Sequence, residues 1–414
     1  MVTLPWELVS TIIEEVVDRS SLLSLCLTSK GAYRETSRWL YGDISDNLDK
    51  DPDRHYRLLK TLIKASHLAS LVRSYTINSV AWIFDAKEDH LDLDDSVGDP
   101  KRGLDMASVI WSILPRALSH MFNLEYLSFR GVSPDPAAYW LLRRVAFQLK
   151  EMCWEACQEG EEMAAFLSTQ RRLETLYLSD GLSHPVDSKA CLTLRLLSGD
   201  STTFGRILPG RPAITHLHWL STMGEYHDHP LLPTLLQELH RITHFSIEGF
   251  SARLRLPKFG GHFRDLVAMK LNYIYEVSPI YSDIENLPFL TSTVSLQPEI
   301  PVIFTIPKLK ILVLSTIYFA SSEDSLIREP DTVLERLFEG TPPLCTIVTD
   351  KMRSYPDGTS EMFYYWWKRS HMAAPTITTT WFHPTRRWPE IAEYCYEEHR
   401  EEMYVELRIY KGFR

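Results

Sequence analysis

A six-residue pattern recurs through most of the sequence, with apolar residues at its first, fourth and sixth positions. The fourth and sixth positions differ by two residues, which is the period of a β-strand with one buried face. Each copy therefore predicts a short strand. Seven copies are complete and an eighth, Leu344/Ile347, is partial; the seven are Val72/Tyr75/Ile77, Leu124/Leu127/Phe129, Leu173/Leu176/Leu178, Ile214/Leu217/Trp219, Ile242/Phe245/Ile247, Leu266/Met269/Leu271 and Leu309/Leu312/Leu314.

The distances between copies indicate what connects the strands. Successive first positions are 52, 49, 41, 28, 24 and 43 residues apart, whereas regular leucine-rich repeats span about 20 to 29 residues. The longer intervals contain helical periodicity, for example over Ala137–Phe166. We therefore expect an α/β fold, an irregular leucine-rich-repeat-like solenoid over residues 46–385. Buried strands of another parallel α/β sheet would show a similar pattern, but the sequence contains no Gly-rich nucleotide fingerprint or Walker sequence.

The first 45 residues predict three short helices. Leu4 and Pro5 begin the first, since proline suits the first helical turn, and the polar segments 18–21 and 28–31 separate it from helices near 22–27 and 32–41. A unit of about 40 residues cannot bury this much apolar surface alone. Part of that surface should therefore contact another chain, or alternatively the helices cap the first repeat.

The same segment resembles the F-box. The residues that carry the resemblance are Leu4-Pro5-Trp6-Glu7-Leu8, Ile12-Ile13 and the Leu-rich stretch from Leu22 to Lys30. The resemblance implies a small three-helix module that binds a Skp-family adaptor and, through it, a cullin of a ubiquitin ligase. It implies that the adaptor contacts are Leu4, Pro5, Leu8, Ile12, Leu23 and Leu27.

A second set of candidate residues comes from the alternation of the strands. The residue between the fourth and sixth positions points to the face opposite the buried one. This geometry selects the target-binding candidates Thr76, Ser128, Tyr177, His218, Ser246 and Lys270, followed by Val313. Their mixed chemistry suits a protein surface better than a single small charged ligand.

Charge and cysteine content restrict the partners and the compartment. The net charge is −10, and no run of Lys and Arg resembles a phosphate-binding stripe, so we expect no nucleic-acid partner. Six scattered cysteines form no disulfide framework. No apolar run reaches the roughly 20 residues that span a bilayer. We expect no membrane partner and a cytoplasmic or nuclear protein.

Several possible small sites are weak. His216, His218 and His244 could form a metal or pH-sensitive cluster, and Cys153 and Cys157 lie four residues apart on an expected helix, where burial is the simpler interpretation. The stretch near residues 85–103 does not match the calcium-binding loop pattern. Its composition predicts a mobile acidic loop. We therefore expect no metal and no cofactor.

The C-terminal part is rich in aromatic residues. Phe363–Trp367 suggests a helix, and residues 386–414 suggest a C-terminal helix that caps the array. No hydrolase or metalloprotease motif is present, so we expect no catalytic residues and no enzyme. The expectation is a substrate-recognition adaptor of a Skp/cullin/F-box ubiquitin ligase; the alternative is a repeat scaffold that binds a protein partner without assembling a ligase.

Overall fold

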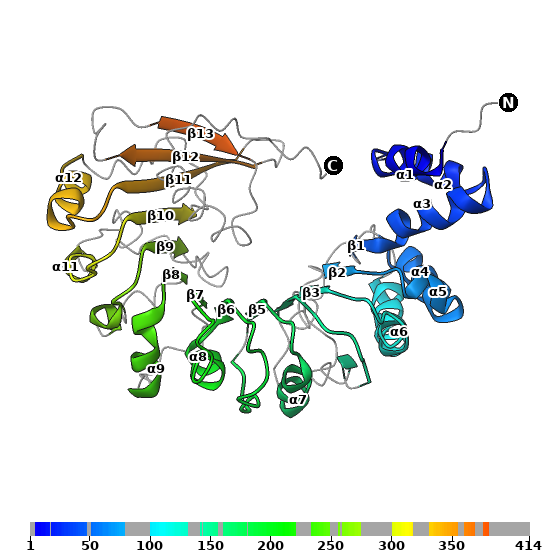
Figure 1. Ribbon diagram of the computed structural model, residues 1–414, viewed down its shortest axis with the longest axis horizontal. Coiled ribbons are helices and arrows are strands. Elements are labelled where there is room, and N and C mark those ends of the chain that lie inside the picture. Colours follow the sequence, from blue (N-terminus) through cyan, green and yellow to red (C-terminus); the bar gives the residue numbers. More distant parts are fainter. Residues whose placement is uncertain are drawn as a thin grey trace. The chain divides into compact units, whose positions relative to one another are not determined.

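The computed structural model describes residues 5–16, 18–47, 51–78, 100–130, 141–142, 144–155, 160–179, 181–220, 233–248, 256, 259–274, 300–317, 331–354, 360–368 and 376–380. The chain forms two compact units, Met1–Ile214 and Thr215–Arg414. Both units combine helices with parallel strands (Figure 1), so the α/β class expected from the sequence is confirmed.

The first unit begins with three helices and continues as a parallel sheet whose strands pair in chain order. The helices are α1 (Trp6–Glu14), α2 (Arg19–Cys26) and α3 (Lys30–Gly42). The strands are β1 (Asp43–Asn47), β2 (Ser74–Asn78), β3 (Tyr126–Arg130), β4 (Glu151–Glu155), β5 (Thr175–Leu178) and β6 (Leu196–Gly199). The helices that connect them lie on one side of these strands (Figure 1): α4 (Pro52–Lys64), α5 (Ser66–Ala69), α6 (Pro100–Leu118), α7 (Glu161–Thr169) and α8 (Ser201–Ile207).

The second unit has the same local plan, followed by two antiparallel strands. Its parallel strands are β7 (His216–Leu220), β8 (His244–Glu248), β9 (Ala268–Ile274), β10 (Ile311–Ile317) and β11 (Thr346–Ser354). Strands β12 (Ser360–Lys368) and β13 (Thr376–Thr380) pair antiparallel after them. The connections contain α9 (Pro233–Glu238), η4 (Leu239–Arg241), η5 (Gly260–His262), α11 (Ile300–Ile303) and α12 (Asp331–Gly340).

Every copy of the six-residue pattern lies at a strand, including the partial eighth copy at β11. The parallel register aligns the fourth positions side by side: Tyr75 with Leu127 in the first unit, and Leu217 with Phe245 in the second. These side chains are buried. Each buried Leu or Phe contributes on the order of 1.5–3 kcal/mol relative to exposure, so the stacked rows form the core.

The expected helical stretch Ala137–Phe166 is wrong over part of its length. Residues 151–155 form strand β4, and helix α7 begins only at Glu161. Cys153 is therefore a buried strand residue rather than a partner of Cys157 on a helix, and Cys157 itself lies outside the described residues. The sequence offered a signal here, because Leu149, Met152 and Trp154 fit the six-residue pattern.

Two further expectations near the chain's acidic and aromatic segments need correction. Residues 363–367 belong to strand β12, where they pair with β11, and not to a helix; aromatic residues favour such strands. Residues 100–103, expected in the acidic loop, begin helix α6, whereas residues 79–99 lie outside the described part of the chain. The expected C-terminal helix, 386–414, also lies outside it.

Buried polar side chains connect segments that lie on successive strands or loops of the first unit. The side-chain amide of Gln170 accepts a hydrogen bond from the backbone N–H of Leu149 at 2.9 Å and donates one to the carbonyl of Phe147 at 3.4 Å. The guanidinium of Arg211 donates to the carbonyls of Ala190 at 3.0 Å and Asp187 at 2.7 Å. These contacts join segments about 20 residues apart, and they satisfy backbone N–H and C=O groups that lie outside the β-sheet hydrogen bonds.

Candidate functional site

Proline begins the first of the three N-terminal helices, and side-chain caps begin the other two. Pro5 precedes α1, and Asp18 caps α2 by accepting a hydrogen bond from the backbone N–H of Ser21 at 2.8 Å. Hydrogen bonds from Ser20 and Ser21 lower the pKa of Asp18 to about 2. Ser29 caps α3 by accepting from the backbone N–H of Ala32 at 3.1 Å. Caps at these positions break the chain into three short helices.

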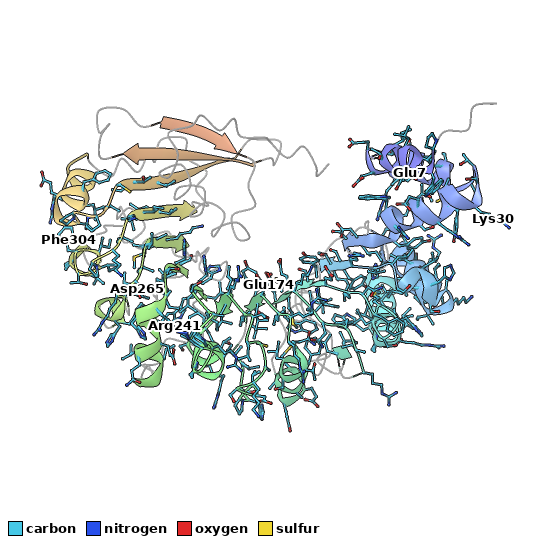
Figure 2. All side chains as sticks on the ribbon, in the orientation of Figure 1. Glu7, Lys30, Glu174, Arg241, Asp265 and Phe304 are labelled. Atoms are coloured by element: carbon cyan, nitrogen blue, oxygen red, sulfur yellow. The ribbon has the colours of Figure 1, made fainter. Side chains whose placement is uncertain are left out.

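Side-chain contacts hold α1 and α2 against α3. The Ser10 hydroxyl donates to a Glu35 carboxylate oxygen at 3.1 Å, and Cys26 Sγ lies 2.8 Å from Thr36 Oγ1. Trp6 lies against Gly31, where an added Cβ would stand 3.0 Å from the indole ring. Glu7 on α1 and Lys30 at the start of α3 are labelled in Figure 2. The result is a packed bundle.

The bundle leaves several of its large apolar side chains exposed to solvent. The exposed fractions are 51% for Leu8, 52% for Ile12, 58% for Leu23 and 89% for Leu27. By contrast, their chain neighbours are buried: Ile13, which follows Ile12, and Leu22, which precedes Leu23. Pro5 is exposed, and Leu4 lies outside the described residues. An apolar patch of this kind is a common feature of protein interaction sites.

Three aromatic side chains extend the exposed apolar surface of the bundle. They were not among the adaptor contacts selected from the sequence, although large aromatic residues in a segment this rich in charged residues can indicate an interface. The three are Trp6, Tyr33 and Trp39, which are 45%, 42% and 45% exposed. Aromatic residues are enriched in protein interfaces and often dominate their binding energy.

The residues selected from the strands lie in single rows. In the first unit the register places Thr76 beside Ser128, then Cys153, then Tyr177. In the second unit it places His218 beside Ser246 and Lys270. Cys153 and, next to Tyr177, Ser198 belong to the same row; they were missed because their strands, β4 and β6, were not predicted.

Burial separates these row residues into two groups. Thr76 and Tyr177 are partly exposed, whereas Ser128, His218, Ser246 and Lys270 are at most 7% exposed. Alternation along a strand determines which side of the sheet a residue faces, but it does not determine exposure. The buried members are not available to a partner in this conformation.

Two histidines of the second unit stack on each other. The imidazoles of His216 and His244 have ring centroids 4.1 Å apart and an interplanar angle of 7°. Each Nδ1 lies 2.9 Å from the hydroxyl of the preceding threonine, Thr215 or Thr243. Burial, followed by the neighbouring His216, lowers the pKa of His244 to about 3. Parallel stacked rings do not direct their nitrogens to one point, so the pair lacks the geometry of a metal site.

Charged residues just before the strands of the first unit alternate in sign. The residues aligned by the sheet are Arg73, Glu125, Lys150, Glu174 and Arg195, and Figure 2 labels Glu174. Lys150 Nζ lies 2.9 Å from a Glu125 carboxylate oxygen, and Arg172 lies 4.0 Å from the other. Lys150 lowers the pKa of Glu125. Lys150 and Arg172 both pair with Glu125, and carboxylates alternate with cations along the row, so this rim is mixed in sign and is not a uniformly charged site.

The described residues contain neither a metal-binding cluster nor a membrane-spanning helix. Among them, no group of three or more His, Cys, Asp and Glu side chains is placed to hold a metal ion. No helix in the same part of the chain is both long and apolar enough to cross a membrane.

Comparison with known proteins does not add a family or a relative: no protein-family profile matches the chain, and no match was found among curated proteins.

Proposed function

We propose that this protein is a substrate-recognition adaptor of a Skp/cullin/F-box ubiquitin ligase, with an F-box-like N-terminal module and a leucine-rich-repeat-like region that selects the target. The observation that carries the proposal is the exposed apolar surface of α1 and α2. Leu8, Ile12, Leu23 and Leu27 have the positions that the F-box resemblance assigns to the adaptor, and all four are exposed. A module that served only to cap the first repeat would bury them.

The energetics of that surface favour a bound state. Complete burial of an exposed apolar side chain of this size contributes on the order of 1.5–3 kcal/mol. The four residues are half or more exposed, so covering them can offset part of the entropic cost of association. The bundle is already packed and capped, so binding would require little reorganisation.

The mechanism needs no chemistry from this chain. Docking of the N-terminal helices on a Skp-family adaptor would connect the chain to a cullin, and a target bound to the repeat region would then stand near the ligase's transfer machinery. The gain is an increase in effective concentration. Of the row residues, the partly exposed Thr76 and Tyr177 are the better candidates for target contacts.

The test is a binding measurement between a purified Skp-family adaptor and the full chain. We expect Ile12→Glu/Leu27→Glu to weaken binding at least about tenfold, because two charged groups replace apolar contacts. The matched control is Phe122→Glu/Leu192→Glu, which changes two apolar residues elsewhere in the first unit that are also more than half exposed. It should bind like the wild type.

Circular dichroism establishes that all three proteins are folded. If the folded wild type does not bind the adaptor, the ligase proposal is wrong. The chain would then be a repeat scaffold that binds a protein partner without ligase assembly.

A further inference from the structure

Helix α4 has two faces of opposite character. His55, Leu59 and Leu62 are buried toward the sheet. Arg54, Arg57, Lys60 and Lys64 are exposed and, at 100° per residue, lie on the opposite side of the helix. We call these four residues the α4 basic face.

The rotation of α4 is held by its buried side. His55 Nε2 lies 2.8 Å from the Tyr75 hydroxyl on β2, in a buried contact, and the two rings are 5.9 Å apart. Asp51 caps the helix by accepting from the backbone N–H of Arg54 at 2.9 Å. Because the His55 contact fixes the buried side of α4 against β2, the α4 basic face is directed away from the core.

Within the part of the chain that the structure describes, no ion pair joins the α4 basic face to a carboxylate. Elsewhere the chain pairs its cations readily, as in Lys150 with Glu125 and Lys308 with Asp265. One carboxylate, Asp53, shares the face, so its local charge is still positive. This excess stands out in a chain whose net charge is −10.

We propose that the α4 basic face binds an acidic segment of a partner protein, one rich in Asp and Glu. From Arg54 to Lys64 the helix rises about 15 Å, which matches about five residues of extended chain. Complementary charge is the only recognition chemistry that the face offers. The proposal is independent of the ligase function, because α4 lies outside the helical bundle α1–α3.

The other polyanions fit less well. Nucleic-acid binding commonly uses six to ten phosphate contacts, and four cations supply fewer. A membrane-binding helix presents large apolar side chains beside its cations, whereas α4 has no exposed large apolar residue.

The experiment measures binding of a fluorescein-labelled peptide of alternating Asp and Glu to the full chain at low and physiological salt. We expect Arg57→Gln/Lys60→Gln/Lys64→Gln to weaken binding roughly tenfold, since each surface pair contributes modestly. The matched control, Arg171→Gln/Lys189→Gln/Arg195→Gln, removes the same charge from other exposed positions of the first unit. It should bind like the wild type.

Three outcomes overturn the proposal. The first is no peptide binding by the wild type. The second is equal weakening of peptide binding in the two variants, which would indicate a non-specific charge effect. The third is tighter binding of a single-stranded oligonucleotide or of vesicles containing phosphatidylserine, with the same dependence on the α4 residues.

Discussion

His244 shows how one buried side chain couples stability to pH. Its imidazole stacks on His216, and burial holds its pKa at about 3, well below the ordinary 6.5. The folded protein therefore binds fewer protons at this position than the unfolded chain when the pH lies between these values. Acidification through that window favours unfolding, and the stability contributed by the neutral ring is fully present only above pH 6.5.

The corresponding prediction concerns His244→Phe, which keeps an aromatic ring but cannot take up a proton. Between pH 7 and pH 5 the wild type should lose about 1–2 kcal/mol more unfolding free energy than the variant. Urea unfolding at the two pH values measures this. The same pH dependence in both proteins would contradict the assignment.

At the scale of the element, strand β6 departs from the pattern for a steric reason. Its sixth position is Gly199, where other strands carry Ile77, Phe129 or Trp154. Helix α8 begins two residues later with Asp200 as its cap, and this places the Thr203 side chain over the strand. A Cβ at Gly199 would lie 2.8 Å from Thr203 Cγ2. The close approach of α8 therefore requires a glycine.

Gly199→Ala should accordingly destabilise the protein by about 1–3 kcal/mol, the usual cost of overpacking a well-packed site. The control is Gly42→Ala at the end of α3, where an added Cβ meets nothing within 4 Å. It should be neutral or slightly stabilising, because alanine favours a helix. Thermal unfolding of both variants makes the comparison, and equal midpoints would contradict this explanation.

At the scale of the whole molecule, each parallel strand pairs with its neighbours in the chain, so a local defect should remain local. Arg211 offers a test because its buried guanidinium, whose pKa burial lowers, donates to the carbonyls of Asp187 and Ala190 in the loop after β5 and of Ile207 at the end of α8. Replacing it leaves those carbonyls without donors.

Arg211→Leu should destabilise the protein by about 3 kcal/mol. Hydrogen exchange should accelerate in β5, β6 and α8, and should not change in β9–β11, because the second group makes no contact with the lost donors. Arg206→Leu, an exposed arginine on α8, serves as the control. Uniform acceleration across both units would show that they open together and would contradict the local account.

Local interactions account for what the sequence determined by itself. The seven strand patterns and the three short N-terminal helices depend on periodicity and on caps such as Asp18 and Ser29, which act within a few residues. The resemblance to the F-box selected Leu8 and Leu27 as adaptor contacts, which stays a prediction. Their exposure, however, is a fact of packing, as is the burial of Ser128 and Lys270 on the expected interaction row.

The tertiary structure alone decided the rest. Strand β6 was not predicted because Gly199, which the close approach of α8 requires, replaces the apolar residue of the pattern. Strand β12 was mistaken for a helix because its aromatic run shows no distinct period. The stacking of His216 on His244 and the contacts of Arg211 join residues more than 20 positions apart. Such contacts depend on which segments the fold brings together, and no short-range pattern along the chain encodes that.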